Sequence, residues 1–149
     1  MDSNVSSSTR VDQLLAFKGR EVHLITPDAS VLEALQRMAE HNVGALAVTE
    51  AGELRGMFSE RDYARKVILK GRASRDTLVS ESMTADVITV SPGDDMTTCM
   101  QLMTENRIRH LPVLEEGRLV GLISVGDVVR AVMQDQRFLI EQLESYIRS

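Results

Sequence analysis

The chain carries the stretch GMFSERD at residues 56–62, and 65 residues later it carries the related stretch GLISVGD at residues 121–127. The same offset relates residues 22–67 to residues 87–132, with fifteen identical positions and no gap. Such a repeat is usually one supersecondary unit that packs against its own copy. A unit of about 60 residues buries too little surface to be stable alone. The sequence therefore predicts two copies in one globule, with two related clefts at their junction.

Composition limits the classes of protein that this chain can belong to. Its 149 residues are 43% hydrophobic, enough for one well-filled core. The formal net charge of −5 gives no overall attraction to nucleic acid, and no apolar run is as long as a bilayer span. The polar start, residues 1–9, predicts a tail rather than a signal peptide. A single cysteine fits a reducing compartment. We expect a cytoplasmic protein with neither nucleic acid nor a membrane as partner.

The first copy predicts the element order β-α-β-β-α. Apolar residues at helical spacing follow a turn, and a hairpin of two short apolar strands comes next. Ser30 and Ser59 stand just before the two helical stretches, where a side-chain hydroxyl can cap free backbone N–H groups. The expected elements are a strand at 22–25, a helix from 31, strands at 45–49 and 53–58, and a helix from 60 to about 70.

The second copy repeats this order, and two predicted helices lie outside the repeat. A polar linker, residues 72–83, connects the copies. The expected elements of the second copy are a strand at 87–90, a helix with Met96, Cys99, Met100 and Met103 as its apolar stripe, strands at 110–114 and 119–123, and a helix from 125 to about 134. The additional helices are expected at 11–17, ended by Gly19, and at 138–147. The predicted divisions are therefore 1–19, 20–72, 80–135 and 136–149.

A doubled β-α-β-β-α unit with Gly-h-h-Ser-x-x-Asp (h, apolar) closing each hairpin resembles the cystathionine-β-synthase (CBS) domain pair, or Bateman module. The fragments NVGALAV (42–48), ITVSP (88–92) and RIRHLPV (107–113) agree with it, and the likeness covers about residues 20–135. The resemblance implies an α+β or α/β fold in which two CBS units pack with pseudo-twofold symmetry. It implies a stand-alone regulatory module that binds an adenine nucleotide (AMP, ADP, ATP, NAD(H) or S-adenosylmethionine), forms a homodimer and acts on a downstream protein.

The repeated motif has chemistry that suits such a ligand. Ser59 and Ser124 stand at strand-to-helix junctions, where free N–H groups and the helix dipole attract an anion. Asp62 and Asp127 offer paired acceptor oxygens for the two hydroxyls of a ribose. The second copy has basic residues where the first has only backbone to offer. The candidate ligand-binding residues are Ser59, Asp62, Arg107, Arg109, His110, Ser124, Asp127, Arg61, Thr89, Thr26, Gly44 and Ala45.

The resemblance also implies how these residues are shared between two unequal clefts. It groups Ser59 and Asp62 with Arg109 and His110, with Arg107 nearby. It groups Ser124 and Asp127 with Arg61 and the backbone of Gly44 and Ala45. Thr89 fits the early-strand polar contact of the family; its counterpart is Leu24, for which Thr26 offers a substitute.

Two other functions compete with this interpretation. Ser-x-x-Asp is also a capping box that needs no ligand, so a structural or adaptor protein with empty clefts is the alternative. An enzyme is disfavoured because the sequence offers neither an activated nucleophile nor a metal cluster. His23 and His41 lack metal-ligand spacing, Cys99 falls on an apolar stripe, and Arg65 and Lys66 are expected at the surface. We therefore expect no catalytic residue, no catalytic cofactor and no metal.

Overall fold

The structure, a computed structural model, describes residues 8–148, so most of the predicted N-terminal tail and Ser149 lie outside the described residues. Its contacts divide the chain into two units. The first-copy unit contains Glu21–Ile88 and Glu115–Val120. The second-copy unit contains the described residues up to Arg20, Thr89–Leu114 and the chain from Gly121 onward. The N-terminal segment thus belongs with the second copy of the repeat.

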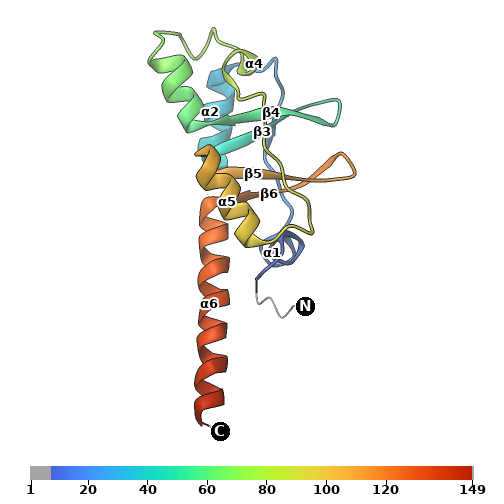
Figure 1. Cartoon of the computed structure of the whole chain (residues 1–149). Helices are drawn as coiled ribbons and strands as arrows, with labels where there is room; N and C mark the ends of the chain where they lie inside the picture. Colours follow the sequence, from blue (N-terminus) through green and yellow to red (C-terminus); the bar gives the residue numbers. More distant parts are fainter. Residues whose placement is uncertain (1–7, 149) are drawn as a thin grey trace. The chain divides into compact units, whose positions relative to one another are not determined.

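The first-copy unit has a three-stranded sheet in the order β2-β3-β4, and Figure 1 labels its hairpin strands β3 and β4. Strand β2 runs parallel to β3, and β3 pairs antiparallel with β4 in the predicted hairpin. Ser59, the last residue of β4, pairs with Ala45, the first residue of β3. The elements are β2 (Leu24–Ile25), α2 (Val31–His41), β3 (Ala45–Glu50), β4 (Glu53–Ser59), α3 (Glu60–Tyr63), a π-helical turn η1 (Ala64–Ile68) and α4 (Val79–Ser82).

Capping residues determine where helix α2 begins and ends. The Ser30 hydroxyl accepts a hydrogen bond from the backbone N–H of Glu33 at 3.1 Å, which satisfies one of the free donors of the first turn. Asn42 ends the helix in the left-handed conformation, with φ of 54°, which asparagine tolerates better than most residues. The predicted first helix of the copy is confirmed.

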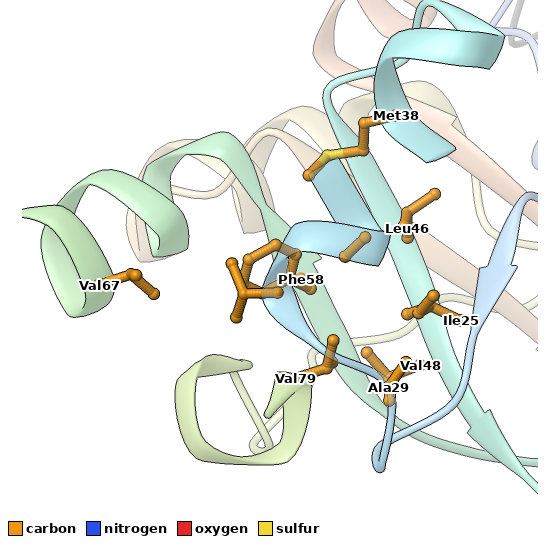
Figure 2. Close-up of a cluster of buried hydrophobic side chains, with 10 residues drawn as sticks. Ile25, Ala29, Met38, Leu46, Val48, Phe58, Val67 and Val79 are labelled. Atoms are coloured by element: carbon orange, nitrogen blue, oxygen red, sulfur yellow. The ribbon is translucent and has the colours of Figure 1, made fainter. Parts of the chain in front are cut away.

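Residues of α2, the sheet, η1 and α4 form the core of the first-copy unit. Figure 2 shows Phe58 among the aliphatic side chains of this cluster. Phe58 is fully buried, and truncating a buried phenylalanine to alanine typically costs about 3–5 kcal/mol. The cluster comprises Ile25, Ala29, Val31, Ala34, Met38, Leu46, Val48, Phe58, Val67 and Val79.

The second-copy unit contains three helices and all of a hairpin except its tip, within the described residues. Asp95 caps α5 by accepting from the N–H of Thr98 at 2.9 Å. Helix α1 packs in this unit: its first residue donates to the carbonyl of Asp94 at 2.7 Å. The elements are α1 (Val11–Lys18, ended by Gly19), α5 (Met96–Asn106), β5 (His110–Glu115), β6 (Arg118–Ser124) and α6 (Val125–Arg148).

The predicted strand at 87–90 is absent, which leaves the sheet of the second copy with two strands. Val90 alone forms a bridge, to Val113. In the first copy, the N–H of Ala47 donates to the carbonyl of His23 at 3.1 Å and extends the parallel pairing. The residue equivalent to Ala47 is Pro112, which has no N–H to donate. A single proline therefore shortens the ladder.

Other boundaries also differ from the sequence predictions. The helix expected at 138–147 is not separate, because α6 runs without a break from 125 to 148; no glycine or proline interrupts it after Gly126. The first strand covers only Leu24–Ile25, and the helix after Ser59 ends at Ile68 rather than Lys70. The polar linker contains α4, whose Val79 is fully buried. The mixed α+β class is confirmed.

The glycine of each repeated stretch marks a close approach of another segment. A Cβ on Gly56 would lie 2.6 Å from the carbonyl oxygen of Thr84. A Cβ on Gly121 would lie 2.7 Å from the side chain of Leu15 in α1. Each hairpin therefore needs a residue without a side chain at this point. In each unit, this approach brings a new segment beside the Ser-x-x-Asp motif.

Candidate functional site

Ser59 and Asp62 form a reciprocal capping box at the start of α3. The backbone N–H of Asp62 donates to the Ser59 hydroxyl at 3.2 Å. One carboxylate oxygen of Asp62, Oδ2, accepts from the backbone N–H and the hydroxyl of Ser59, each at 2.9 Å. Asp62 is 7% exposed. These bonds hold its carboxylate in one orientation at the helix N-terminus.

The second oxygen of Asp62 is held by two side chains from outside the box. Its Oδ1 accepts from the hydroxyl of Thr84 at 2.9 Å and from the ammonium group of Lys66 at 3.0 Å. Lys66, which the sequence places at the surface, is 40% exposed, and its contact with Asp62 was not predicted. Its i,i+4 spacing from Asp62 on one helical face was the missed signal.

Gly44 and Ala45 lie at the same helix N-terminus. The carbonyl of Gly44 accepts from the backbone N–H of Glu60, the first residue of α3, at 3.0 Å. A Cβ on Gly44 would lie 2.9 Å from a Glu60 carboxylate oxygen. The first-copy unit thus brings together four candidate residues: Gly44, Ala45, Ser59 and Asp62.

The second-copy unit repeats the capping box with different partners. The backbone N–H of Asp127 donates to the Ser124 hydroxyl at 3.2 Å, and Asp127 Oδ2 accepts from the N–H of Ser124 at 2.9 Å. The same oxygen accepts from the ammonium group of Lys18 at 2.6 Å. The other oxygen accepts from the guanidinium group of Arg130 at 3.0 Å. Asp127 is 8% exposed.

Two opposed effects act on the pKa of the Asp127 carboxyl group. Burial acts to raise the pKa of its carboxyl group, but hydrogen bonds from Lys18 and Ser124 and the charge of Lys18 lower it more. The pKa of Asp127 therefore lies below its ordinary value of 3.8. Lys18 also donates to the carbonyl of Leu122 at 2.9 Å, so α1 is tied to both β6 and the motif.

Arg109 and His110 lie beside this second motif. The carbonyl of Arg109 accepts from the backbone N–H of Val125, the first residue of α6, at 2.8 Å. His110 is half-buried. Burial lowers the pKa of His110, the charges of Arg109 and Lys18 lower it further, and Asp127 opposes them. A pKa below 6.5 leaves this imidazole neutral at pH 7, able to accept as well as donate a hydrogen bond.

The remaining candidates occupy more peripheral places. Arg61 is exposed in the first turn of α3, and Thr26 is exposed after β2. Arg107 ends α5 in the left-handed conformation, with φ of 54°. Thr89 is half-buried just before the bridge of Val90. The expected pairing of Asp62 with Arg109 and His110 joins residues of different units and stays a prediction.

Besides the Lys66 contact, three contacts to the two aspartates were missed by the sequence reasoning. Thr84 and Lys18 come from segments outside the Ser-x-x-Asp stretches, and no local pattern indicates their contacts. Arg130 stands three residues after Asp127, a spacing that places both on one helical face. These residues add positive charge, from Lys66 on one motif and from Lys18 and Arg130 on the other.

The remaining titratable residues considered from the sequence are Cys99, His23 and His41. Cys99 is fully buried, and burial raises the pKa of its thiol to about 12, as expected of a core residue. The rings of His23 and His41 stack with centroids 4.0 Å apart. Within residues 8–148, no group of three or more His, Cys, Asp or Glu could hold a metal ion.

The sequence, compared with known families, matches the CBS domain twice, over residues 18–69 and 79–134. The chain belongs to the CBS-domain family. CBS-domain proteins of this kind are regulatory or signal-transduction proteins. The two matches place one capping-box motif in each CBS domain, Ser59 and Asp62 in the first, Ser124 and Asp127 in the second.

Relatives with CBS domains match over most of the chain. The CBS domain-containing protein CBSX3, mitochondrial, of Arabidopsis thaliana is 41% identical over 99% of this chain and 76% of its own length. A solved structure of a protein with CBS domains from Burkholderia ambifaria MC40-6 is 48% identical, with a TM-score of 0.83 over 86% of this chain and 96% of that one.

A more distant solved structure shares the fold. The CBS domain pair of protein MJ0100, in complex with 5-methylthioadenosine and S-adenosyl-L-methionine, is 23% identical, with a TM-score of 0.76. It covers 85% of this chain and 98% of that one. Among the described residues of this CBS-domain protein, none of the helices is both long and apolar enough to span a bilayer.

Proposed function

We propose that this CBS-domain protein is a regulatory module that binds an adenine nucleotide (AMP, ADP, ATP or NAD(H)) and changes its shape or its contacts with a downstream protein on binding. The observation that carries the proposal is the pair of buried carboxylates, Asp62 and Asp127, each fixed by a capping box at a helix N-terminus. The adenosyl ligands of the related CBS domain pair support the same ligand class.

The bonds to each carboxylate fall into a fixed and a movable set. Backbone and serine donors fix one side of Asp62 and of Asp127. Thr84 and Lys18 hold further acceptor positions. The movable set comprises two long side chains, Lys66, which is 40% exposed, and Arg130, which is 70% exposed. Because their charged ends reach solvent, these two side chains can move away from the carboxylates. A ribose could then donate its two hydroxyls to the freed oxygens.

The negative charge of the phosphate groups would be balanced by nearby cationic side chains. Lys18 and Arg130 contact the second motif, with Arg109 at the adjoining strand entry. A displaced lysine or arginine would remain within reach of a phosphate and could bind it by a charge-assisted hydrogen bond. Lys66 and the exposed Arg61 offer less in the first copy. We therefore propose that the two copies bind with unequal affinity.

The alternative, an adaptor protein without a ligand, is favoured by one observation. The four hydrogen-bond donors on Asp62 already match the roughly four acceptor positions of a carboxylate. Heat release of bound nucleotide from the purified protein, with identification by mass spectrometry, separates the two functions. We then expect AMP, ADP, ATP or NAD(H) to raise the melting temperature of nucleotide-free protein and guanine nucleotides to have less effect. Equal, flat responses to all of them would establish the adaptor function instead.

We also propose that the module works as a homodimer without catalytic activity. Exposed apolar residues in or next to its helices, among them Ile68, Leu69 and Met133, support association. Light scattering should give about twice the chain mass of 16.5 kDa. A strictly monomeric mass at micromolar concentration would rule this part out, and turnover of the bound nucleotide would rule out the non-catalytic role.

A further inference from the structure

The C-terminal half of α6 carries large apolar side chains that its own unit leaves exposed. Figure 1 shows α6 as one long helix whose red end runs on past the other elements of its unit. Every residue from 136 to 148 is exposed. Leu139, Ile140 and Leu143 are 50%, 56% and 55% exposed, and Ile147 is 81% exposed.

These side chains share one face of the helix. Met133, Ile140 and Ile147 recur every seven residues. Leu143 lies three residues after Ile140 and four before Ile147, and Leu139 lies four residues before Leu143. This spacing places all five on one side of α6. We name them the α6 stripe. Phe138, which is 55% exposed, falls on the opposite side at about 100° per residue.

The exposed apolar area of the stripe favours burial against a partner. Its side chains, with neighbouring Val129, expose roughly 500–600 Å² of surface, which is at the upper end of what a monomer usually leaves open. Two such faces packed together would remove roughly 1,000 Å² or more from water, the size at which specific interfaces begin. A protruding helical segment of thirteen residues is also marginal without a partner.

We propose that the α6 stripe binds the α6 stripe of a second copy of this chain in an antiparallel pair. The inference deepens the proposed function, because it rests on the homodimer proposed there and assigns the surface that forms it. The overhang of α6 is about 20 Å long, so an antiparallel overlap uses the whole stripe of both helices.

Charges at the edge of the stripe set the antiparallel direction. Arg137 and Glu144 lie two turns apart on the same edge. In an antiparallel pair the same edges of the two helices face each other. With the twofold axis near Ile140, Arg137 faces Glu144 of the partner subunit, and the pairing occurs twice. In a parallel pair Arg137 would face the opposite edge, whose acidic residue, Asp135, already accepts two hydrogen bonds from Thr9.

A groove between α5 and α6 lies where the partner helix would end. The antiparallel register places the last turn of the partner helix beside Met133. The groove adjoins this point and extends the apolar surface, because Met100 is 37% exposed within it. Its lining residues are Thr97, Met100, Gln101, Thr104, Glu105 and Val132.

The experiment measures the mass of the full-length chain by sedimentation equilibrium over a concentration series. We expect a dimer whose dissociation constant rises at least tenfold in Leu143→Glu, because a charge would be buried in the interface. Phe138→Glu is the matched control, with the same new charge and similar starting exposure on the other face, and we expect it to leave the dimer intact. Circular dichroism and melting curves of each variant check that the chain is folded.

Charge reversal tests the direction and does not depend on the stripe variants folding. Arg137→Glu should weaken the dimer several-fold, and adding Glu144→Arg should restore it, since the pair faces across the dimer rather than along one helix. Arg137→Cys with Glu144→Cys should form a disulfide-linked dimer, whereas Glu144→Cys alone should not.

Each outcome decides the proposal. A monomeric wild-type chain overturns both the homodimer and the stripe. A dimer that survives Leu143→Glu overturns the stripe alone and leaves the homodimer standing. Equal loss with Phe138→Glu, or efficient cross-linking by Glu144→Cys alone, also overturns it. Selective loss with Leu143→Glu, together with charge-reversal rescue, supports it.

Discussion

The ammonium nitrogen of Lys18 lies 2.6 Å from a carboxylate oxygen of Asp127, a residue 109 positions further along the chain. The contact joins α1 to the capping box at the start of α6. It places a cation from the N-terminal helix on the carboxylate that the proposed ligand would use. Asp62 has a corresponding contact with Lys66, which lies in η1 rather than in α1. A lysine side chain therefore reaches the aspartate of each capping box, from α1 in the second-copy unit and from η1 in the first-copy unit.

Lys18→Met should raise the pKa of Asp127. Lys18 supplies much of the effect that lowers this pKa, and burial, the largest single effect, acts to raise it. The carboxyl titration, followed by nuclear magnetic resonance of the aspartate side chains, measures the change. Lys66→Met is the matched control, because it removes a lysine from Asp62 and not from Asp127. An Asp127 pKa that stays low in Lys18→Met would show that Ser124 and Arg130 are sufficient.

His110 should make the protein less stable as the pH falls through about 6.5. Its pKa in the folded state is below 6.5, so the unfolded chain binds a proton first and acidification favours unfolding. This contribution is complete above pH 6.5 and disappears as the pH falls through the lowered folded-state pKa. Asp127, also with a lowered pKa, adds its loss only below pH 3.8. The two effects therefore separate on the pH scale.

Urea unfolding at about pH 7.5 and at about pH 5.5 measures the effect of His110. We expect the free energy of unfolding to fall less over this range in His110→Gln than in the wild type. Equal falls in both proteins would show that other groups control the acid sensitivity.

Gly56→Ala should destabilise the first-copy unit by about 1–3 kcal/mol. The new methyl group would meet the carbonyl oxygen of Thr84 at 2.6 Å, and the Thr84 segment, which pairs with Met57, would have to move. Thermal unfolding measures the loss. Gly93→Ala is the control, because a Cβ there meets nothing within 4 Å. Similar melting temperatures for the two variants would mean that the hairpin adjusts freely.

Asp127→Asn and Asp62→Asn should each weaken nucleotide binding about ten- to a hundredfold at the affected site. The lost bonds are charge-assisted, and such bonds contribute roughly 1.5–3 kcal/mol. Calorimetric titration with the nucleotide identified by mass spectrometry measures both. Glu40→Gln, a change at an exposed position of α2, is the control and should bind as the wild type does.

The same titrations decide which residues share a ligand. If the cross-copy grouping holds, Asp62→Asn and Arg109→Ala will be non-additive, because both act on one ligand. Asp127→Asn will then add independently to either change. Coupling of Arg109 to Asp127, with none to Asp62, would instead place the ligand contacts within one copy.

Much of the fold and the capping boxes could be predicted from the sequence, because they depend on local chemistry and on the repeat. Ser59 and Asp62, three residues apart, satisfy each other's backbone donors wherever that helix begins, and the same holds for Ser124 and Asp127. The apolar spacing of Val31, Ala34 and Met38 likewise needs only a helix to define a buried face. The offset of 65 residues then carries each assignment from one copy to the other.

Tertiary structure alone decided what meets these motifs from a distance. No local pattern indicates that Lys18 contacts Asp127 or that Thr84 contacts Asp62, because chain segments far apart in sequence meet only when the core is packed. The lost strand before Val90 depends on Pro112, which matters only once the two segments lie side by side and one N–H is missing. Local sequence preferences determine where the helices and strands begin and end. Long-range packing determines which residues contact each buried carboxylate.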